Sequence, residues 1–268
     1  MKPIVSVLIC TYNAEHFIEG TLESILEQTE KNIEVLILDN NSTDKTTKII
    51  ETIKDPRIHL FTSKKNLGPY GGLNFLLPKA QGKYIAIQDH DDFWDSTKLE
   101  KQIRFLETHT EDVWCGTTTR MVFKYNTTYF DYVFPKKSFY VIHPSLLFRN
   151  RPWLAYDTKE LYMGDAYFMK HILCKWEKKL GTINEVLTTH IIQANYSNAS
   201  FSRFKINKSC IRRLFAIHWW RPYTFAALGF ELMRKLLYPT LKKQHKFGTI
   251  VKLEQFPFKL LGLKIRLD

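Results

Sequence analysis

Four consecutive residues, Asp89-His90-Asp91-Asp92, place three carboxylates directly after a short apolar run, Tyr84–Ile87. That run is typical of a buried strand, so the carboxylates are expected where the strand ends. Like charges this close are costly unless a cation lies among them. Hard oxygen ligands suit Mg²⁺ or Mn²⁺, and substrate phosphates usually fill the remaining positions. The alternative is that the acids only cap the next helix, but Asp95 or Ser96 already fits that purpose.

Alternating strand and helix patterns precede this acidic cluster. Val5–Cys10 is a nearly continuous apolar run, typical of a strand that is covered on both faces. Apolar residues recur at helical spacing over Phe17–Leu26, and Ile33–Leu38 predicts a second strand. A polar turn with a capping residue, Asp39–Ser42, then leads into a second helix whose buried stripe is Ile49, Ile50 and Ile53. This order predicts right-handed crossovers and a parallel sheet.

The alternation continues toward the acidic cluster and beyond it. Arg57–Phe61 predicts a third strand, and the glycines of the loop Lys64–Gly72 let the backbone turn or approach a ligand. That loop is neither a Walker loop nor a dinucleotide-binding fingerprint. A helix is predicted over about 96–109 and a strand at Val113–Thr117. Ligands of such sheets bind beyond the carboxyl ends of the strands, so one crevice should be shared by Thr11, Tyr12, Asn13, Asp39 and Asp89–Asp92.

Beyond residue 120 the periodicity loosens into aromatic-rich pieces. A helix is predicted around Met163–Met169 and a strand near Gly181–Thr189. We expect an α/β domain over 1–200, in which a mainly parallel central sheet is flanked by helices. Its halves are about 1–115 and 116–200, and a basic helical tail follows at 201–268.

The tail carries the net charge of +12. Of the 39 basic and 27 acidic residues, 15 and 3 lie in 201–268, which leaves 24 of each sign elsewhere. Its cations alternate with aromatic residues such as Trp219 and Trp220. Helices of this kind can lie in a bilayer interface with Lys and Arg toward anionic headgroups. Packing in an ordinary core remains an alternative, because Trp and Phe also bury well.

Cysteine usage and the N-terminus predict a cytoplasmic protein. The four cysteines, Cys10, Cys115, Cys174 and Cys210, lie far apart and show no metal-type spacing, which favours reduced thiols. The chain runs from Met1 straight into a strand without a signal-peptide pattern. No segment approaches the ~20 apolar residues of a spanning helix.

Four segments in order carry a resemblance to a known family: Val5–Asn13, Leu38–Asp44, Asn66-Leu67-Gly68 and Tyr84–Asp92. Over about residues 3–110 the chain resembles the family 2 glycosyltransferases of the GT-A fold, of the bacterial surface-polysaccharide type. The resemblance implies a nucleotide diphosphate sugar as donor, a divalent metal (Mn²⁺ or Mg²⁺) and inversion at the anomeric carbon.

The resemblance also implies roles for single residues of the donor site. Tyr12 would stack on the base, with Thr11, Asn13 and Asn66 as neighbouring contacts, and Asp39 would accept the hydrogen bond of the base imide. Asp89 and Asp91 match the Asp-x-Asp element, with Asp91 as the better metal ligand and Asp89 nearer the ribose. Asn40 stands where many members have a second Asp.

Farther along, Gly164-Asp165 resembles the family's Glu-Asp element, which implies that Asp165 is the catalytic base; a helix-cap carboxylate is the alternative. Thr189–Ser197 is similar to a closing segment that often carries Arg and His. Here His190 stands at the Arg-like place and Ile192 at the His-like place, so no catalytic role is assigned to that segment.

Displacement of a nucleoside diphosphate needs a cation at the leaving phosphates and a carboxylate that takes the acceptor's proton. Asp91 and Asp165 offer these two functions. The leading hypothesis is therefore an inverting, metal-dependent glycosyltransferase acting on a lipid-linked or membrane-proximal glycan, peripheral on the inner face of the plasma membrane through its tail. Nucleic acid is not expected as a partner.

The rival hypothesis is a catalytically silent nucleotide-sugar-binding subunit of the same fold, because Asn40 and Gly164 depart from the family pattern. A sugar nucleotidyltransferase would need a Gly-rich basic loop after the first strand, which Thr11–Ala14 is not.

Overall fold

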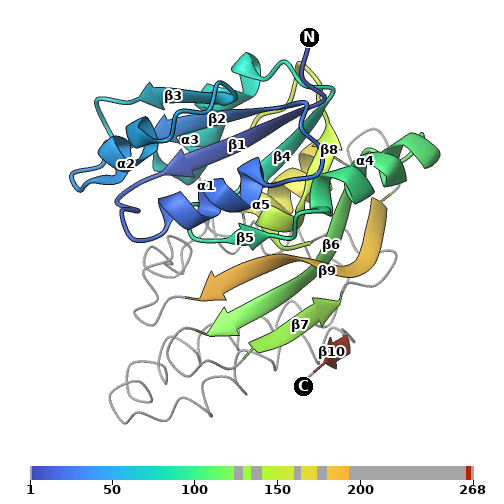
Figure 1. Cartoon of the computed structure of the whole chain (residues 1–268). Coiled ribbons are helices and arrows are strands. Elements are labelled where there is room, and N and C mark those ends of the chain that lie inside the picture. Colours follow the sequence, from blue (N-terminus) through green and yellow to red (C-terminus); the bar gives the residue numbers. More distant parts are fainter. Residues whose placement is uncertain are drawn as a thin grey trace.

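The first half of the chain forms the parallel part of one mixed sheet. The computed structural model describes residues 2–123, 129–133, 141–159, 164–173, 180–192 and 264–266. Four parallel strands lie side by side in the order β3-β2-β1-β4 (Figure 1). They are β1 (Val5–Thr11), β2 (Ile33–Asp39), β3 (Ile58–Thr62) and β4 (Tyr84–Gln88). Burial of β1, β2 and β4 on both faces explains their nearly continuous apolar sequences.

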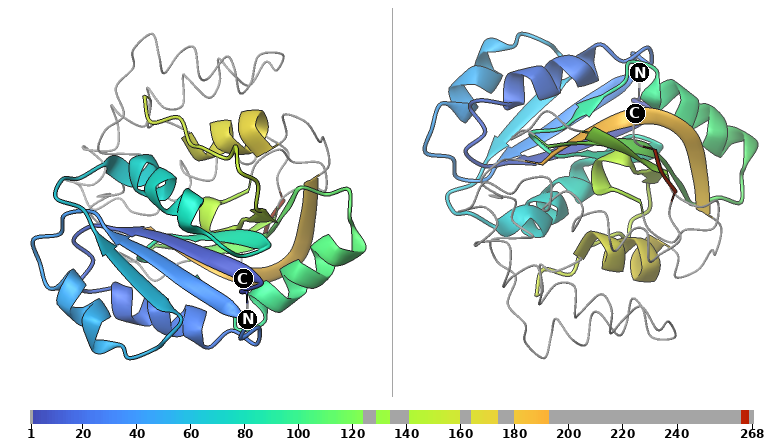
Figure 2. Two further views of the ribbon diagram at one scale, coloured as in Figure 1. Left: turned by 90° about the horizontal axis from the view of Figure 1, so that it is seen from above. Right: turned by 90° about the horizontal axis from the view of Figure 1, so that it is seen from below.

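Helices cover both faces of this sheet, as Figure 2 shows. On one face lie α1 (Ile18–Leu26), α2 (Thr46–Thr52) and α4 (Lys98–Thr108). On the other face lie α3 (Gly68–Leu76), a 3₁₀ turn at Leu77–Lys79, and α5 (Gly164–Tyr167), which continues as a π-helical segment over Phe168–Leu173. Two hydrophobic clusters result, one on each face, because every strand residue of the parallel sheet points toward one helix layer or the other.

The second half extends the sheet with antiparallel strands. β8 (Leu147–Arg149) pairs with β4, and β6 (Trp114–Phe123) lies between β8 and β7 (Tyr129–Val133). The long strand β9 (Leu180–Ile192) runs parallel to β6 with a register shift near Thr118. It also pairs with the two-residue strand β5 (Phe93–Trp94), so Thr189 faces Phe93 directly after the acidic cluster. β9 therefore brings a distant part of the chain to the end of β4.

These elements confirm the predicted mixed α/β fold and the predicted strands and helices of residues 5–117. The capping predictions were wrong. α4 begins after Thr97, and Asp95 instead accepts hydrogen bonds from the Thr97 N–H and hydroxyl. The Ser42 hydroxyl oxygen accepts the Asn13 N–H, while α2 begins only at Thr46.

The downstream predictions have mixed outcomes. β9 confirms the strand near 181–189, and α5 confirms a helix that begins at Gly164-Asp165. Of the predicted helical tail, only Lys264–Arg266 lies within the described residues, and these three form a strand, β10, against β7. The rest of the tail lies outside them. Within the described part of the chain, Cys10 and Cys115 are free thiols. Among the helices described, none combines the length and the apolar character that a membrane span requires.

Candidate functional site

The carboxyl ends of β1, β2 and β4 meet at one edge of the sheet. Thr11 and Asp39 are paired in register as the last residues of β1 and β2, and the Asn40 N–H donates to the Thr11 carbonyl at 2.8 Å. Asp89 follows β4, which is the other neighbour of β1. Burial, together with smaller effects of the nearby Asp89 and Asp39 carboxylates, raises the pKa of the Cys10 thiol to about 12. Both carboxylates therefore lie close to Cys10, at the edge of the sheet where the sequence predicts a shared crevice.

At the ends of β1 and β2, Thr11 Oγ1 and Asp39 Oδ1 are buried without a hydrogen-bond partner among the described residues. The other carboxylate oxygen of Asp39 accepts the Ser42 N–H at 3.1 Å. Buried polar groups are rarely left unpaired, and such exceptions are often found where a ligand binds. Tyr12, next along the chain, keeps 42% of its surface exposed. A half-exposed aromatic residue next in sequence to Thr11, together with an unpaired acceptor on Asp39, suits a planar ligand that carries N–H donors.

Asn13 has a structural role in the same loop. Its backbone is left-handed (φ 49°), its side-chain oxygen accepts the Thr43 N–H at 2.9 Å, and its own N–H donates to Ser42. These contacts join the loop after β1 to the loop after β2. Asn13 therefore fixes the conformation of the loop that carries Tyr12.

Asn40 fixes the glycine-containing loop before α3. Its side-chain N–H₂ donates to Asn66 Oδ1 at 3.2 Å and to the Gly68 carbonyl at 3.1 Å, while its oxygen accepts the Leu67 N–H at 2.8 Å. Gly68 has φ 74°, a left-handed conformation that favours glycine. An Asp at position 40 could accept but could not donate, so the asparagine is explained by the loop that it holds. Asn66 is held by Asn40, and its side-chain oxygen also accepts the Gly68 N–H.

The acidic turn after β4 is bound to β9. Asp92 is fully buried, and its Oδ1 accepts the Ile191 N–H at 2.8 Å while its Oδ2 pairs with His190 Nδ1 at 2.7 Å. Thr21 on α1 donates its hydroxyl to the carbonyls of His90 and Asp92. The turn is thus held from both sides. Ligand atoms of Asp89, Asp92 and His190 lie within 4.8 Å of one another, which is a grouping that can hold a metal ion.

The electrostatics of this turn favour a cation. Burial, followed by the charges of Asp92 and Asp91, raises the pKa of Asp89 to about 8. Burial alone would lower the pKa of His190, but the Asp92 carboxylate that it contacts outweighs burial and raises it to about 9. A carboxylate held among other carboxylates in a buried site is stabilised in its charged form by an added positive charge. The residues present therefore fit a divalent metal with oxygen and imidazole ligands.

The sequence places Asp92 in the predicted crevice without a role in metal binding, and it assigns no role to His190. It paired Asp89 with Asp91, which is half-buried and acts on Asp89, Asp92 and His190 through its charge. No local signal shows that His190 returns to the turn, because 98 positions separate it from Asp92. The sequence feature that comes nearest to indicating His190 is its position in Thr189–Ser197, the segment that resembles the family's closing segment.

Asp165 lies in the first turn of α5, on the other side of the same region. Its N–H donates to the Tyr70 hydroxyl at 3.1 Å. Its charge contributes to the raised pKa values of Asp89 and of buried Tyr156, after larger effects of burial. The carboxylate of Asp165 is therefore close enough to the acidic turn for its charge to act on Asp89.

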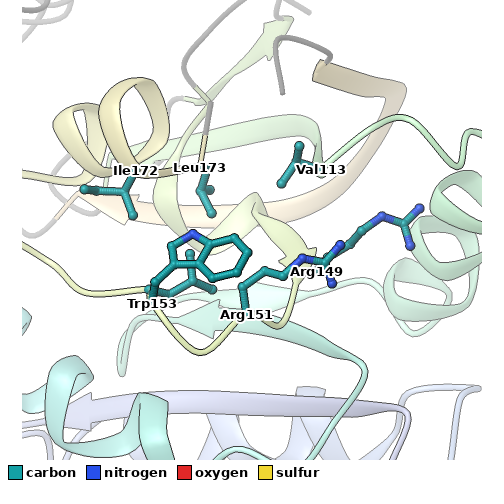
Figure 3. A pocket seen from close by; sticks show the side chains of 7 residues that line it. Val113, Arg149, Arg151, Trp153, Ile172 and Leu173 are labelled. Carbon is teal, nitrogen blue, oxygen red and sulfur yellow. The ribbon is translucent and has the colours of Figure 1, made fainter. Parts of the chain in front are cut away.

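A separate pocket lies at the opposite end of β4. Figure 3 shows Trp153 and Arg151 beside Ile172 and Leu173, with Arg149 at the rim. Arg149 is paired with Tyr84, the first residue of β4, whereas the acidic turn follows the last. The residues that line this pocket include no carboxylate. It is therefore distinct from the acidic crevice.

The chain is similar in sequence and in fold to glycosyltransferases. The model of the family "Glycosyl transferase family 2" matches residues 6–172. A relative in Escherichia coli, the UDP-Glc:alpha-D-GlcNAc-diphosphoundecaprenol beta-1,3-glucosyltransferase WfaP, is 47% identical over 105 residues, which are 39% of this chain and 42% of WfaP. The chain thus matches about two fifths of that relative's length.

Two solved structures share the fold. Staphylococcus aureus TarS 1-349 in complex with UDP-GlcNAc superposes with a TM-score of 0.67 at 18% identity, over 81% of this chain and 66% of TarS. The mannosyltransferase PcManGT of Pyrobaculum calidifontis, in complex with GDP-Man and Mn²⁺, gives a TM-score of 0.58 at 20% identity, over 80% of this chain and 61% of PcManGT.

Proposed function

The chain belongs to glycosyltransferase family 2, and we propose that it is an inverting transferase that moves a sugar from a nucleotide diphosphate sugar to a lipid-linked or membrane-proximal glycan in surface-polysaccharide biosynthesis. One observation carries the proposal. The edge of the sheet that holds the unpaired Thr11 and Asp39 oxygen atoms also holds the acidic turn at Asp89, and the charge of Asp165 acts on that turn.

The donor base would bind between Tyr12 and Asp39. The half-exposed ring of Tyr12 offers a stacking face, and Asp39 Oδ1 offers a buried acceptor that lacks a partner among the described residues. An imide N–H of a pyrimidine base matches that acceptor, because leaving it unpaired would cost about 1–3 kcal/mol. TarS, which shares the fold, binds UDP-GlcNAc and so shows that this fold accepts a uridine nucleotide. UDP-glucose is our first candidate donor, since it is the donor in the name of WfaP.

The metal would be held by the acidic turn and β9. We assign Asp89 and Asp91 as carboxylate ligands, together with His190, whose Nδ1 is already engaged by Asp92. A carboxylate that fixes one nitrogen of a histidine while the other binds metal is a common supporting arrangement. When bound there, Mg²⁺ or Mn²⁺ supplies positive charge to the leaving diphosphate. The Mn²⁺ complex of PcManGT supports this choice of ion.

Asp165 would act as the general base. In a single displacement the acceptor oxygen bonds to the anomeric carbon, the bond from that carbon to the diphosphate oxygen breaks, and the acceptor proton passes to the Asp165 carboxylate. The configuration at the anomeric carbon inverts as a result. The side chain at the start of α5 lies near the acidic turn, as this geometry requires.

The proposed acceptor rests on the relative WfaP, and the proposed location rests on the basic tail. WfaP acts, by its name, on GlcNAc linked through a diphosphate to undecaprenol. An acceptor of that class is embedded in a membrane, and the basic residues of 201–268 suit the anionic inner surface of that membrane. We therefore propose peripheral attachment through the tail.

The test is transfer from UDP-glucose to a synthetic α-D-GlcNAc diphosphate that carries a short lipid chain, with Mn²⁺ and with EDTA. UDP-GlcNAc and GDP-mannose serve as alternative donors. We expect Mn²⁺-dependent release of the nucleotide diphosphate and a β-linked product. If calorimetry detects donor binding but no donor is turned over, the protein is instead the silent binding subunit. Retention of the donor's anomeric configuration would refute inversion.

A further inference from the structure

Position 164 has no room for a side chain. A Cβ atom built on Gly164 would lie 2.2 Å from Cε2 and 2.6 Å from Cζ of the Tyr70 ring. Heavy atoms in a packed interior do not approach that closely, so any larger residue would require the ring to move. The ring of Tyr70 therefore fills the volume that a side chain before Asp165 would otherwise occupy.

The Tyr70 ring is fixed by its surroundings. It is buried and stacks on Tyr156, with ring centroids 5.3 Å apart and planes 8° from parallel. Tyr156 in turn stacks on Phe168 at 3.9 Å, and its hydroxyl pairs with His143 Nε2 at 2.8 Å. Asn74 on α3 holds the backbone of Tyr156 through two hydrogen bonds. Displacement of Tyr70 would therefore disturb this whole stack of aromatic rings.

The hydroxyl of Tyr70 has a second function. It accepts the N–H of Asp165 at 3.1 Å. The first N–H groups of a helix have no acceptor within the helix, so an outside acceptor fixes where the helix begins. Tyr70 lies on α3, directly after the loop that Asn40 holds in the donor crevice. The hydroxyl thus connects the donor side of the site to the start of α5.

We propose that Tyr70 is a positioning residue for the transfer reaction: its ring replaces a side chain at position 164, and its hydroxyl holds the backbone of Asp165 so that the carboxylate stays beside the acidic turn. The reaction itself rests on the proposed function, which assigns Asp165 as the base. The proposal explains the glycine at a position where the family resemblance implies Glu. The Tyr70 ring occupies the space of that side chain, so the glycine does not by itself imply an inactive site.

Tyr70→Phe isolates the hydroxyl, because it keeps the ring and its stacking. We expect kcat with UDP-glucose and Mn²⁺ to fall roughly 3- to 10-fold, because the variant loses one hydrogen bond that holds the reacting group in place. KM for UDP-glucose should stay unchanged, since Tyr12 and Asp39 are untouched. The Asp165 amide proton should exchange with solvent faster in this variant, as NMR can measure without any turnover.

Tyr84→Phe is the matched control. It also removes a tyrosine hydroxyl with a strong partner, Glu107 at 2.7 Å, but at the far end of β4. We expect it to change the melting temperature but neither kcat nor Asp165 exchange. Equal effects of the two substitutions on kcat would overturn the positioning role.

A double-mutant cycle tests the ring. Gly164→Ala alone should lower both the melting temperature and kcat, because the new methyl group meets Tyr70. In a Tyr70→Ala background the ring is absent, so Gly164→Ala should cause little further loss of either. Additive losses would show that ring and glycine are not coupled, and would overturn the proposal.

The outcomes separate this inference from the proposed function. If Asp165→Asn keeps wild-type turnover, the assignment of Asp165 as the base fails. The amide exchange of Asp165 and the melting temperatures of the variants in the double-mutant cycle then still decide whether Tyr70 holds the start of α5. If Asp165→Asn loses turnover while Tyr70→Phe keeps both kcat and Asp165 exchange, the base assignment stands and the positioning role is refuted.

Discussion

Lys98 is a titratable side chain buried in the core beside Trp94, and its removal should stabilise the protein at low pH. Its side chain is fully buried on α4, where Nζ donates to Gln102 Oε1 at 2.7 Å and lies 3.9 Å from the centre of the Trp94 ring. Burial lowers the pKa of Lys98 from its usual 10.5 to about 7, and a weaker effect of Cys115 opposes this. The perturbation is Lys98→Met, which keeps the volume and removes the charge.

The sign follows from proton binding. Below pH 7 Lys98 is protonated in both states, so the folded state bears the full cost of a buried charge. Between about pH 7 and 10.5 the unfolded state still binds a proton that the folded state has released, and stability rises with pH. The pKa difference corresponds to about 5 kcal/mol. Lys98→Met also removes the hydrogen bond to Gln102 and the contact with the Trp94 ring, and this loss offsets about 2 kcal/mol of the gain in stability.

Lys98→Met should therefore raise the free energy of unfolding by about 3 kcal/mol at pH 6, and this gain should vanish at about pH 9 and reverse at higher pH. Urea denaturation at pH 6, 8 and 9.5 measures it. Lys101→Met on the exposed side of α4 is the control, since Lys101 forms only a surface pair with Glu185, and its small effect should not depend on pH in this way. A destabilised Lys98→Met at pH 6, or an effect that is the same at every pH, would refute the reasoning.

The other predictions concern the site and the tail. Asp91→Asn should abolish Mn²⁺-dependent transfer and leave thermal melting unchanged, because it removes a proposed ligand without altering the core; unchanged turnover would exclude the metal assignment. Asp92→Asn should lower both turnover and the melting temperature, since Asp92 ties the turn to β9 through His190 and Ile191; an unaltered melting curve would argue against that link. Asp165→Asn should lower turnover roughly 10²-fold or more with little change in donor affinity, whereas loss of donor binding at a normal catalytic rate would make Asp165 a structural cap. Deletion of 204–268 should release the protein from anionic vesicles in sedimentation, and salt should weaken binding of the intact chain; an intact chain that stays in the supernatant at low salt would contradict membrane attachment.

The gathering of the strand ends at one edge of the sheet, where we propose the donor site, could be predicted from the sequence because its parts are local. Each of Thr11, Asp39 and Asp89 follows a short apolar run, and parallel strands joined by helices place their carboxyl ends at one edge. The capping predictions were wrong because Asp95 and Ser42 found partners in neighbouring loops, Thr97 and Asn13, that local propensity does not show.

The sequence by itself determined the parallel sheet, the helices that cover it and the order of acidic residues at its edge, since apolar periodicity and turn chemistry act over a few residues. Only the tertiary structure decided that β9 pairs with β5 and so brings His190 to Asp92. It also decided that the Tyr70 ring occupies the space at Gly164. Both contacts join residues more than 90 positions apart, and they depend on strand pairing and on side-chain volume in a packed interior, which no local pattern records.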